Sequence, residues 1–476
     1  MKKSTDVFCI GASAAAGAAA IASRRWYPEK KVTCVRNVSA AGAAAVASRR
    51  WYPEKKVTCV RNVSYTVVPC GIPYIYGYLG GSVEKNKIPD ELLTGKGIEL
   101  LTDNVIDVDI RGKVVKLEGG DEYSYEKLVF GTGSHPFVPP IGGLDLKNVF
   151  TVKKDPKYLE EIGKALEGAN DVVVIGGGFI GVEMAEQIKM KGIPNVTIVE
   201  LLPHCLLLAC EEEMAIRAEE ELRKLGVNII LNASAKNIVG NGKAEAVELS
   251  TGQKVKADVV IIGIGAAAEV DLAEKVGLKV DRKMGIIVDR YMRTSEKDVF
   301  ACGDCATKPS FITGNIVPIR LASVACSEGI IAGSNLYKLN RQTLGAVGAF
   351  ATKIGNLCIG AAGLSTKMCK DNGIDYYTGE IQAPDRHPGG LPGCTMNMKA
   401  KLIFRKSDNK IIGGHVAGGM GAADMANIIS VAIQSGLTSD ELAVRQIATH
   451  PLLTGSPLVT HVMWAAEDGV LNKNKQ

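Results

Sequence analysis

Residues 171–186 read DVVVIGGGFIGVEMAE, and this stretch decides the fold. It begins with an apolar strand, Val172 to Ile175, which runs directly into a turn and then a helix. The turn carries Gly176, Gly178 and Gly181. The first glycine permits the tight bend, the second lets the backbone approach a pyrophosphate, and the third lets the helix pack on the strand. The stretch predicts a dinucleotide-binding βαβ unit.

A second strand, Val196 to Val199, follows at the distance that such a unit requires and ends at Glu200. A carboxylate at this position accepts hydrogen bonds from a ribose 2′-hydroxyl and repels a 2′-phosphate. Glu200 therefore favours NADH over NADPH. A glycine turn in some other α/β protein is the weaker interpretation, because strand, glycines, helix and acid occur together.

The N-terminus carries a weaker fingerprint of the same kind. The apolar run from Val7 to Ile10 leads into Gly11, but serine replaces the middle glycine, and no acid ends the second strand. Arg36 or Arg61 stands where the ribose-binding carboxylate is expected. A second nucleotide unit is predicted here, without the usual ribose-binding acid.

A near-exact duplication interrupts this unit. Residues 17–39 read GAAAIASRRWYPEKKVTCVRNVS, and residues 42–64 repeat them with one change. Each copy predicts an Ala-rich helix followed by a strand, whereas a βαβ unit needs only one such half. The fingerprint serine is Ser13 as written. Deleting residues 13–38 restores G-x-S-x-x-G at Gly11, Ser39 and Gly42. As the origin of the duplication, an error in the sequence record is preferred over a genuine looped-out insertion. A solenoid needs three or more repeats, so two adjacent copies do not indicate a repeat architecture.

Composition excludes several classes of protein. The chain has 476 residues, 22% of them charged, and a net charge of +5 without a basic arm, so no nucleic-acid partner is expected. No apolar run reaches the roughly 18 residues that span a bilayer, so no membrane partner is expected either. The twelve cysteines lack regular spacing and are interpreted as thiols in a reducing cytoplasm.

Two further motifs complete a family pattern. Phe130–Ser134, FGTGS, resembles a strand end that follows a nucleotide site, and Thr294–Asp304 reads TSEKDVFACGD. With both glycine turns, the chain resembles the pyridine nucleotide-disulfide oxidoreductases over nearly its whole length. The resemblance implies an FAD site and an NADH site. The FAD site would use Gly11, Ser13 or Ser39, Gly42, Arg61, Thr132, Gly133, Asp304 and Ala322, and the NADH site Gly176, Gly178, Gly181, Glu200 and Gly265.

The same resemblance singles out Cys70 in TVVPCGIPY. This motif is most similar to coenzyme A disulfide, persulfide and polysulfide reductases, which use one cysteine, and no partner cysteine follows Cys70 closely. Such a thiol would pass through a mixed disulfide or persulfide, and it must react as the thiolate. A buried structural cysteine is the ordinary alternative.

The remaining candidates carry weaker signals. Glu183 resembles a family glutamate beside the nicotinamide, and His450 a C-terminal histidine that serves as an acid; a solvated carboxylate and an interface histidine are the alternatives. Phosphates of a substrate such as coenzyme A would meet Arg49, Arg50, Arg386 and His387, although Ser48 and Trp51 depart from the coenzyme A-binding pattern. No metal site is expected, because no second pair accompanies Cys302 and Cys305.

The expected fold is α/β, with two Rossmann-like domains and a C-terminal α+β dimerisation domain. Residues 1–143 and 285–335 would form the FAD-binding domain, and residues 144–284 would form the NADH-binding domain. Residues 336–476 would form the dimerisation domain. The expected function is electron transfer from NADH through FAD and Cys70 to a small sulfur compound, in a homodimer or a dimer of dimers. The alternatives are an NADH oxidase that cycles Cys70 as a sulfenate and an NADH-sensing flavoprotein that recruits a partner.

Overall fold

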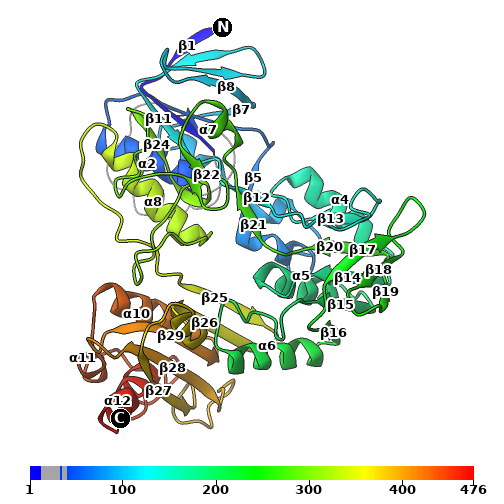
Figure 1. Ribbon diagram of the computed structural model, residues 1–476, viewed down its shortest axis with the longest axis vertical. Coiled ribbons are helices and arrows are strands. Elements are labelled where there is room, and N and C mark those ends of the chain that lie inside the picture. Colours follow the sequence, from blue (N-terminus) through cyan, green and yellow to red (C-terminus); the bar gives the residue numbers. More distant parts are fainter. Residues whose placement is uncertain (12–32, 35–39, 476) are drawn as a thin grey trace. The chain divides into compact units, whose positions relative to one another are not determined.

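The computed structural model describes residues 1–11, 33–34 and 40–475, so Ser13 and Ser39 lie outside the described residues. The chain forms two compact units. Figure 1 labels the helices and strands. Unit 1 comprises residues 1–139, 151–168 and 265–346, and unit 2 comprises residues 140–150, 169–264 and 347–476.

The centre of unit 1 is a parallel sheet with the strand order β24-β11-β2-β4-β7. Its strands are β2 (Val7–Ile10), β4 (Val57–Arg61), β7 (Glu99–Thr102), β11 (Lys127–Phe130) and β24 (Val299–Ala301). All four residues of β2 and all five of β4 are buried, as expected for parallel strands covered on both faces. The N-terminal βαβ unit predicted from Val7 to Ile10 is thus present.

Two helices of this unit, α2 (Ala40–Trp51) and α8 (Ala322–Asn335), pack at very short range. A Cβ at Gly329 would lie 2.2 Å from the carbonyl oxygen of Ala40, and one at Gly333 would lie 2.1 Å from that of Ala44. The small residues of the Ala-rich helix therefore bring both N-termini to the same end of the sheet.

The duplication leaves a trace in the strand pairing. The short strand β3 (Thr33–Cys34), from the first copy, pairs with Phe8 and Cys9 of β2. Strand β4, from the second copy, pairs with the same two residues in the same register. Strand β4 and all but the first two residues of helix α2 come from the second copy. Among the described residues, this helix and strand supply the second half of the predicted βαβ unit.

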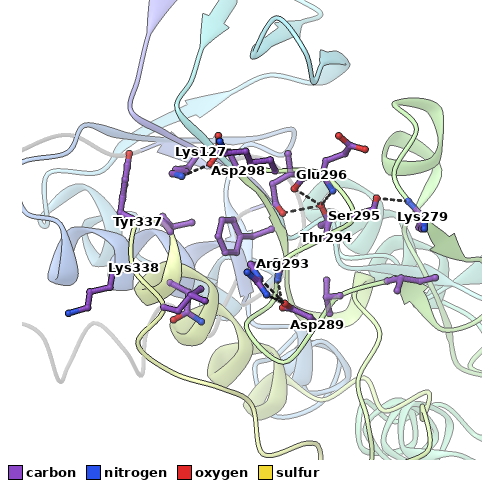
Figure 2. Close-up of a pocket in the computed structure, with 18 residues that line it drawn as sticks. Lys127, Lys279, Asp289, Arg293, Thr294, Ser295, Glu296, Asp298, Tyr337 and Lys338 are labelled. Carbon is purple, nitrogen blue, oxygen red and sulfur yellow. Dashed lines mark hydrogen bonds and ion pairs between the residues drawn. The ribbon is translucent and has the colours of Figure 1, made fainter.

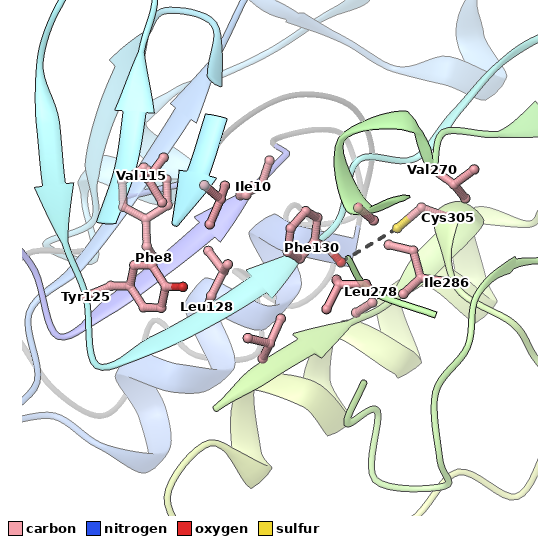
Figure 3. Packing of buried hydrophobic residues seen from close by; sticks show 14 of the residues in the cluster. Phe8, Ile10, Val115, Tyr125, Leu128, Phe130, Val270, Leu278, Ile286 and Cys305 are labelled. Atoms are coloured by element: carbon pink, nitrogen blue, oxygen red, sulfur yellow. Dashed lines mark hydrogen bonds between the residues drawn. The ribbon is translucent and has the colours of Figure 1, made fainter. Parts of the chain in front are cut away.

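A second apolar core of unit 1 lies between the central sheet and the segment around Val270, Leu278 and Ile286 (Figure 3).

An outer sheet has the order β1-β10-β9-β8. The other elements of unit 1 are β1 (Lys2–Ser4), β5 (Thr66–Val67), η1 (Pro69–Gly71), η2 (Pro73–Ile75), η3 (Glu84–Asn86), β6 (Lys87–Ile88), α3 (Glu91–Thr94), β8 (Val105–Asp109), β9 (Val114–Leu117), β10 (Glu122–Ser124), β12 (Ser134–Pro136), α4 (Pro156–Leu166), β21 (Ala266–Ala268), α7 (Asp271–Lys275), β22 (Val280–Asp281), β23 (Gly285–Ile286) and η4 (Gly303–Cys305).

Unit 2 contains the second predicted nucleotide fold, a sheet with the order β13-β20-β14-β15-β16. Its elements are β13 (Val149–Thr151), β14 (Asp171–Ile175), α5 (Phe179–Met190), β15 (Asn195–Val199), α6 (Glu212–Lys224), β16 (Val227–Ile230) and β20 (Val259–Ile262), with the antiparallel strands β17 (Ala235–Val239), β18 (Ala246–Leu249) and β19 (Lys254–Lys256) beside them. The strand–turn–helix–strand order predicted from residues 171–199 is confirmed.

The C-terminal part of unit 2 is an antiparallel sheet with the order β25-β26-β29-β28-β27. Its strands are β25 (Phe350–Ile354), β26 (Leu357–Gly363), β27 (Tyr376–Ala383), β28 (Met398–Arg405) and β29 (Ile411–Gly418), and its helices are α9 (Thr366–Asp371), α10 (Ala422–Gln434), α11 (Ser439–Ala443) and α12 (His461–Asn474). Helices α10 and α12 pack on the sheet, which gives the expected α+β domain.

The units divide the chain differently from the expected domains. Residues 265–284 pack with unit 1, which places this boundary twenty residues before the expected one at 285. Residues 151–168, with helix α4, also belong to unit 1. Helix α4 begins with Asp155, whose side chain accepts a hydrogen bond from the Tyr158 amide, and with Pro156 in its first turn. In the described part of the chain, every helix is too short or too polar to cross a lipid bilayer.

Candidate active site

The glycine turn of unit 2 has the geometry of a pyrophosphate cradle. A Cβ at Gly181 would lie 1.8 Å from the carbonyl oxygen of Gly176, so helix α5 can approach the strand end only with glycine there. Gly176 has φ +107°, a conformation that side chains rarely adopt. Gly178, before the first residue of α5, has open space where a Cβ would be. The turn fits the nucleotide phosphates of NADH.

Glu200 lies at the end of β15, beside this turn, and is only 9% exposed. Its carboxylate accepts hydrogen bonds from the amides of Gly177 and Leu202, the latter at 2.8 Å. Two backbone donors hold the side chain in place while carboxylate lone pairs remain for a ribose hydroxyl. The geometry fits the role predicted for Glu200. Gly265, the predicted strand-end glycine, has φ +105° and belongs to unit 1.

Glu183 lies on α5 and is held by the C-terminal domain within unit 2. The Thr352 hydroxyl donates a hydrogen bond to it at 2.7 Å, and the Gly355 amide donates one to the neighbouring Glu186 at 2.6 Å. Burial raises the pKa of Glu183 to about 7, and the charge of Glu186 acts in the same direction. Glu183 is therefore a half-buried carboxyl with a fixed hydrogen-bond partner, and its role beside the nicotinamide stays a prediction.

The replacement Glu183→Gln is expected to stabilise the protein more at pH 8 than at pH 5. The folded pKa of about 7 lies above the ordinary value of 4.5, so the folded state loses stability as pH rises from 4.5 to 7, and the loss is complete above 7. Glutamine removes this term, and the gain in the free energy of unfolding should be larger at pH 8 by about 2 kcal/mol.

Urea unfolding followed at both pH values measures this difference. The matched control is Glu220→Gln on the exposed side of α6, which should show the same change at pH 5 and pH 8. A pH-independent effect of Glu183→Gln would show that the buried carboxyl does not titrate in this range.

The strand ends of unit 1 form a second cradle, which fits FAD. A Cβ at Gly131, after β11, would lie 2.6 Å from the Cβ of Ala41 and 2.9 Å from its amide nitrogen. The N-terminal turn of α2 thus comes within contact of the strand end, and the helix amides are available to phosphates. Gly133 and Gly303 have φ values of +77° and +80°. Thr132 donates to the Glu269 carbonyl at 2.6 Å, which fixes the loop after β11.

Asp304, the predicted FAD ligand, lies in η4 and is 7% exposed. Ser134 donates to its Oδ2 at 2.8 Å. Lys154 donates to the Ser134 hydroxyl at 3.1 Å, with its Nζ 3.7 Å from Asp304 Oδ2. Asp304 therefore belongs to a hydrogen-bonded cluster from three separate segments. Ala322, the other predicted contact, is the first residue of α8 in the same unit.

A buried ion pair holds the loop that carries Asp304. Lys308 donates to the carbonyls of Gly303 and Ala306, at 2.9 and 2.7 Å, and lies 3.7 Å from Glu328. Glu328, on α8, accepts a hydrogen bond from the Gly303 amide at 2.8 Å. Burial raises the pKa of Glu328 to about 7, and the Lys308 charge opposes this shift. The pair fixes the turn at Gly303 and thereby the position of Asp304.

Cys70, the predicted redox thiol, lies in η1 and is exposed. The negative charge of Cys70, when the thiol is ionised, would raise the pKa of Lys154 and of Cys326 on α8. Burial raises the pKa of Cys326 to about 11, with the Cys70 charge adding to the shift. Cys70 has no cysteine close in sequence, but the fold places Cys326 within its electrostatic range. By contrast, Cys302 and Cys305 are fully buried, as expected for a structural role.

The arginines of the N-terminal unit have local partners. Arg61, at the end of β4, is 5% exposed and pairs with Asp90, donating at 2.6 Å, while its Nε has no hydrogen-bond partner among the described residues. Arg49 is 7% exposed and donates to the carbonyls of Pro53, Lys55 and Lys96. The prediction that Arg49 meets a substrate phosphate is wrong, because its guanidinium closes the turn after its own helix. Arg50 is exposed on α2.

The loop that carries the predicted substrate residues Arg386 and His387 lies beside His450 in unit 2. The His387 ring contacts the Thr454 carbonyl at 3.1 Å, and its amide donates to Pro451, so its loop packs on the segment that begins at His450. The His450 Nδ1 accepts from the Leu452 amide at 3.3 Å. Arg386 donates to the Pro392 carbonyl at 3.0 Å within its own loop. The structure thus joins these residues, and their roles toward substrate stay predictions.

The described residues also form two cavities that none of the predicted site residues lines. A cavity of about 670 Å³ in unit 1 is lined by charged side chains, including Lys127, Arg293 and Lys338. Figure 2 shows Lys127 paired with Asp298 and Arg293 paired with Asp289. A second cavity of about 580 Å³ in unit 2 lies beside Glu211, Lys367 and Lys401. The main charges of both cavities are partly neutralised by their neighbours.

Sequence reasoning missed Lys154, Lys308, Glu328 and Cys326. Lys154, Glu328 and Cys326 lie far in sequence from the segments they support, and none of the four residues belongs to a motif of its own. Only one weak signal was available: Lys308 follows the TSEKDVFACGD segment and Glu328 lies in the next helix, where an uncompensated charge would be costly.

Comparison with known proteins agrees with this geometry. The sequence profile described as "Pyridine nucleotide-disulphide oxidoreductase" matches residues 5–329, and the profile of that family's dimerisation domain matches residues 350–458. The chain belongs to the pyridine nucleotide-disulfide oxidoreductase family, whose members are flavoproteins that use FAD and NADH. The expected family, fold class and cofactors are thereby confirmed.

Particular relatives narrow the comparison. The chain is 32% identical over 402 residues to an NADH oxidase of Methanocaldococcus jannaschii, covering 80% of this chain and 86% of the relative. It is 34% identical over 358 residues to an NAD(P)H coenzyme A polysulfide/persulfide reductase of Pyrococcus horikoshii, covering 74% and 78%. A solved NAD-dependent persulfide reductase from A. fulgidus superposes with a TM-score of 0.86 at 31% identity, covering 94% of this chain and 84% of that one.

Proposed function

We propose that this protein reduces a small sulfur substrate, a persulfide, a polysulfide or coenzyme A disulfide, with electrons from NADH. The observation that carries the proposal is Cys70, an exposed thiol in unit 1, the unit that carries the predicted FAD cradle and Asp304. The similarity to persulfide and polysulfide reductases supports it.

The candidate residues would form two cofactor-binding sites. Gly176, Gly178, Gly181 and Glu200 would hold NADH, and Asp304 with the turns around Gly131 and Gly303 would hold FAD. FAD, when bound, accepts a hydride from NADH and returns two electrons to sulfur. Cys70 attacks the substrate as the thiolate and forms a mixed disulfide or persulfide, and His450 would protonate the leaving thiolate.

The assembly and location are part of the proposal. The dimerisation domain indicates an oligomer, and we expect a homodimer or a dimer of dimers. Buried thiols such as Cys9, Cys59 and Cys302 fit a reducing cytoplasm. Arg50, Arg386 and His387 are the candidates for phosphate contacts to coenzyme A.

A second candidate function is NADH oxidation by oxygen through a Cys70 sulfenate, favoured by the similarity to the M. jannaschii NADH oxidase. Two rates distinguish these functions. One is anaerobic NADH turnover with polysulfide, a persulfide or coenzyme A disulfide, and the other is aerobic NADH consumption without a sulfur substrate. We expect the sulfur reaction to exceed the oxygen reaction by at least about tenfold in kcat/KM. Turnover with oxygen alone would make the protein an oxidase, and bound flavin with negligible turnover would favour a sensing role.

A further inference from the structure

The two nucleotide folds differ at the end of their second strand. In unit 2, Glu200 directly follows Val199, which pairs with the last residue of β14. In unit 1, Arg61 ends β4 and directly follows Val60, which pairs with the last residue of β2. Arg61 therefore occupies the place of the ribose-binding acid in such a unit. A guanidinium has donors but no acceptor for a ribose hydroxyl.

The guanidinium of Arg61 holds a carboxylate from another segment at this strand end. Its Nη2 donates to Oδ2 of Asp90 at 2.6 Å and to the Ser64 carbonyl at 2.8 Å, while its Nη1 donates to Oδ1 of Asp90. Two parallel donors fix both the position and the plane of a carboxylate. Asp90 precedes α3, yet its side chain makes no capping hydrogen bond there. Arg61 therefore orients this carboxylate.

Arg61 is the buried partner of the pair and Asp90 the accessible one, with 6% and 34% of their side-chain surfaces exposed. An ionised carboxylate has about four lone-pair positions. The two donors of one guanidinium occupy two of them and leave positions for a further donor. Asp90 is thus a fixed and accessible acceptor beside a strand end that lacks its own.

Two polar atoms at the same strand end are buried without a hydrogen-bond partner among the described residues. They are Nε of Arg61, a donor in a side chain more than nine-tenths buried, and Oδ1 of Asn62, an acceptor. Unpaired buried polar atoms cost free energy and are rare in folded proteins. The two atoms indicate a ligand that both accepts and donates hydrogen bonds, as a ribose hydroxyl does.

We propose that Asp90, oriented by Arg61, accepts a hydrogen bond from a hydroxyl of the adenosine ribose of FAD and so replaces the acid that β4 lacks. The inference rests on the assignment of FAD to unit 1. It concerns binding alone, so no covalent bond changes and no electrons move. Asp90 becomes a determinant of cofactor specificity, because it distinguishes FAD from flavins without this ribose.

The test is the binding of flavin to the full-length protein after removal of FAD, followed by flavin fluorescence. Two ligands are compared, FAD and an FAD analogue that lacks both hydroxyls of the adenosine ribose. Wild-type protein should bind the analogue at least about tenfold more weakly, because a hydrogen bond to a charged acceptor is lost. In Asp90→Ala, the two ligands should bind within about twofold of each other. The control Glu91→Ala, next in the chain and exposed, should keep the wild-type ratio.

The ratio of the two affinities separates a ribose contact from a structural ion pair. A structural pair would lower both affinities alike in Asp90→Ala, and an unchanged ratio would overturn the proposal. Should Asp90→Ala fail to fold, because it leaves the Arg61 charge unpaired, the wild type decides: equal affinities for FAD and the analogue would overturn the proposal.

A separate variant tests the assignment of FAD on which the proposal rests. Asp304→Ala should weaken the binding of both ligands by at least about tenfold, since Asp304 belongs to the predicted FAD cradle. Unchanged binding of both ligands in this variant would overturn the assignment of FAD to this cradle, and the proposal with it. Neither measurement uses NADH or a sulfur substrate, so failure of the proposed sulfur reduction would leave both results unaffected.

Discussion

Cys70→Ser is expected to lower NADH-dependent sulfur reduction by at least about a thousandfold, because a serine hydroxyl cannot form the mixed disulfide or persulfide. Reduction of the bound flavin by NADH under anaerobic conditions should stay within about twofold of wild type. The glycine turn and Glu200 that would bind NADH lie in unit 2, whereas Cys70 lies in unit 1. Stopped-flow absorbance of the flavin measures the first half-reaction. Release of sulfide from polysulfide or a persulfide, or of free thiol from coenzyme A disulfide, measures the second.

The matched control is Cys210→Ser in unit 2. The Cys210 thiol donates to the Leu206 carbonyl at 3.6 Å, a bond that a hydroxyl can retain. This variant should keep both half-reactions. Sulfide release by Cys70→Ser at a rate within a few-fold of wild type would remove Cys70 from the mechanism and leave the electron acceptor to another group.

Gly181→Val should abolish productive NADH binding while FAD binding persists. The new Cβ would lie 1.8 Å from the Gly176 carbonyl oxygen, so α5 must move away from the turn or the turn must open. We expect KM for NADH to rise by at least about a hundredfold, since the phosphates lose the helix N-terminus. Steady-state kinetics give KM, and the visible spectrum after gel filtration gives the FAD content.

Gly163→Ala is the control for this substitution. Gly163 lies in α4, and a Cβ there would be 3.9 Å from Tyr76, an ordinary contact. Helical alanine in that position should leave KM unchanged and raise stability slightly. An unaltered KM in Gly181→Val would mean that the turn does not hold the nucleotide.

The local parts of this protein are predictable from its sequence. The strand, glycine turn and helix at residues 171–190 follow from hydrophobic periodicity and backbone sterics, which act between near neighbours. Glu200 follows from the length of one βαβ unit. The Asp304 loop was identified through family resemblance, because its short sequence alone does not specify a ligand.

The electrostatic surroundings of the site are not predictable in the same way. Lys154 lies 150 residues before Asp304 in the chain, and no periodicity links the two. The pairing of Lys308 with Glu328, and the electrostatic effect of Cys70 on Cys326, likewise depend on how α8 packs in unit 1. Arg49 misled the sequence reasoning, because a basic residue near a phosphate site and a basic residue that closes a turn look alike until burial is known.

The shared register of β3 and β4 on β2 has a consequence for genetics. Phe8 and Cys9 pair with Thr33 and Cys34 in the same register as with Thr58 and Cys59. Two segments of identical sequence can therefore pair with the same residues of β2. In a polypeptide that carries both copies, a substitution at Thr58 or Cys59 therefore has to be compared with the same substitution at Thr33 or Cys34 before the position is called tolerant.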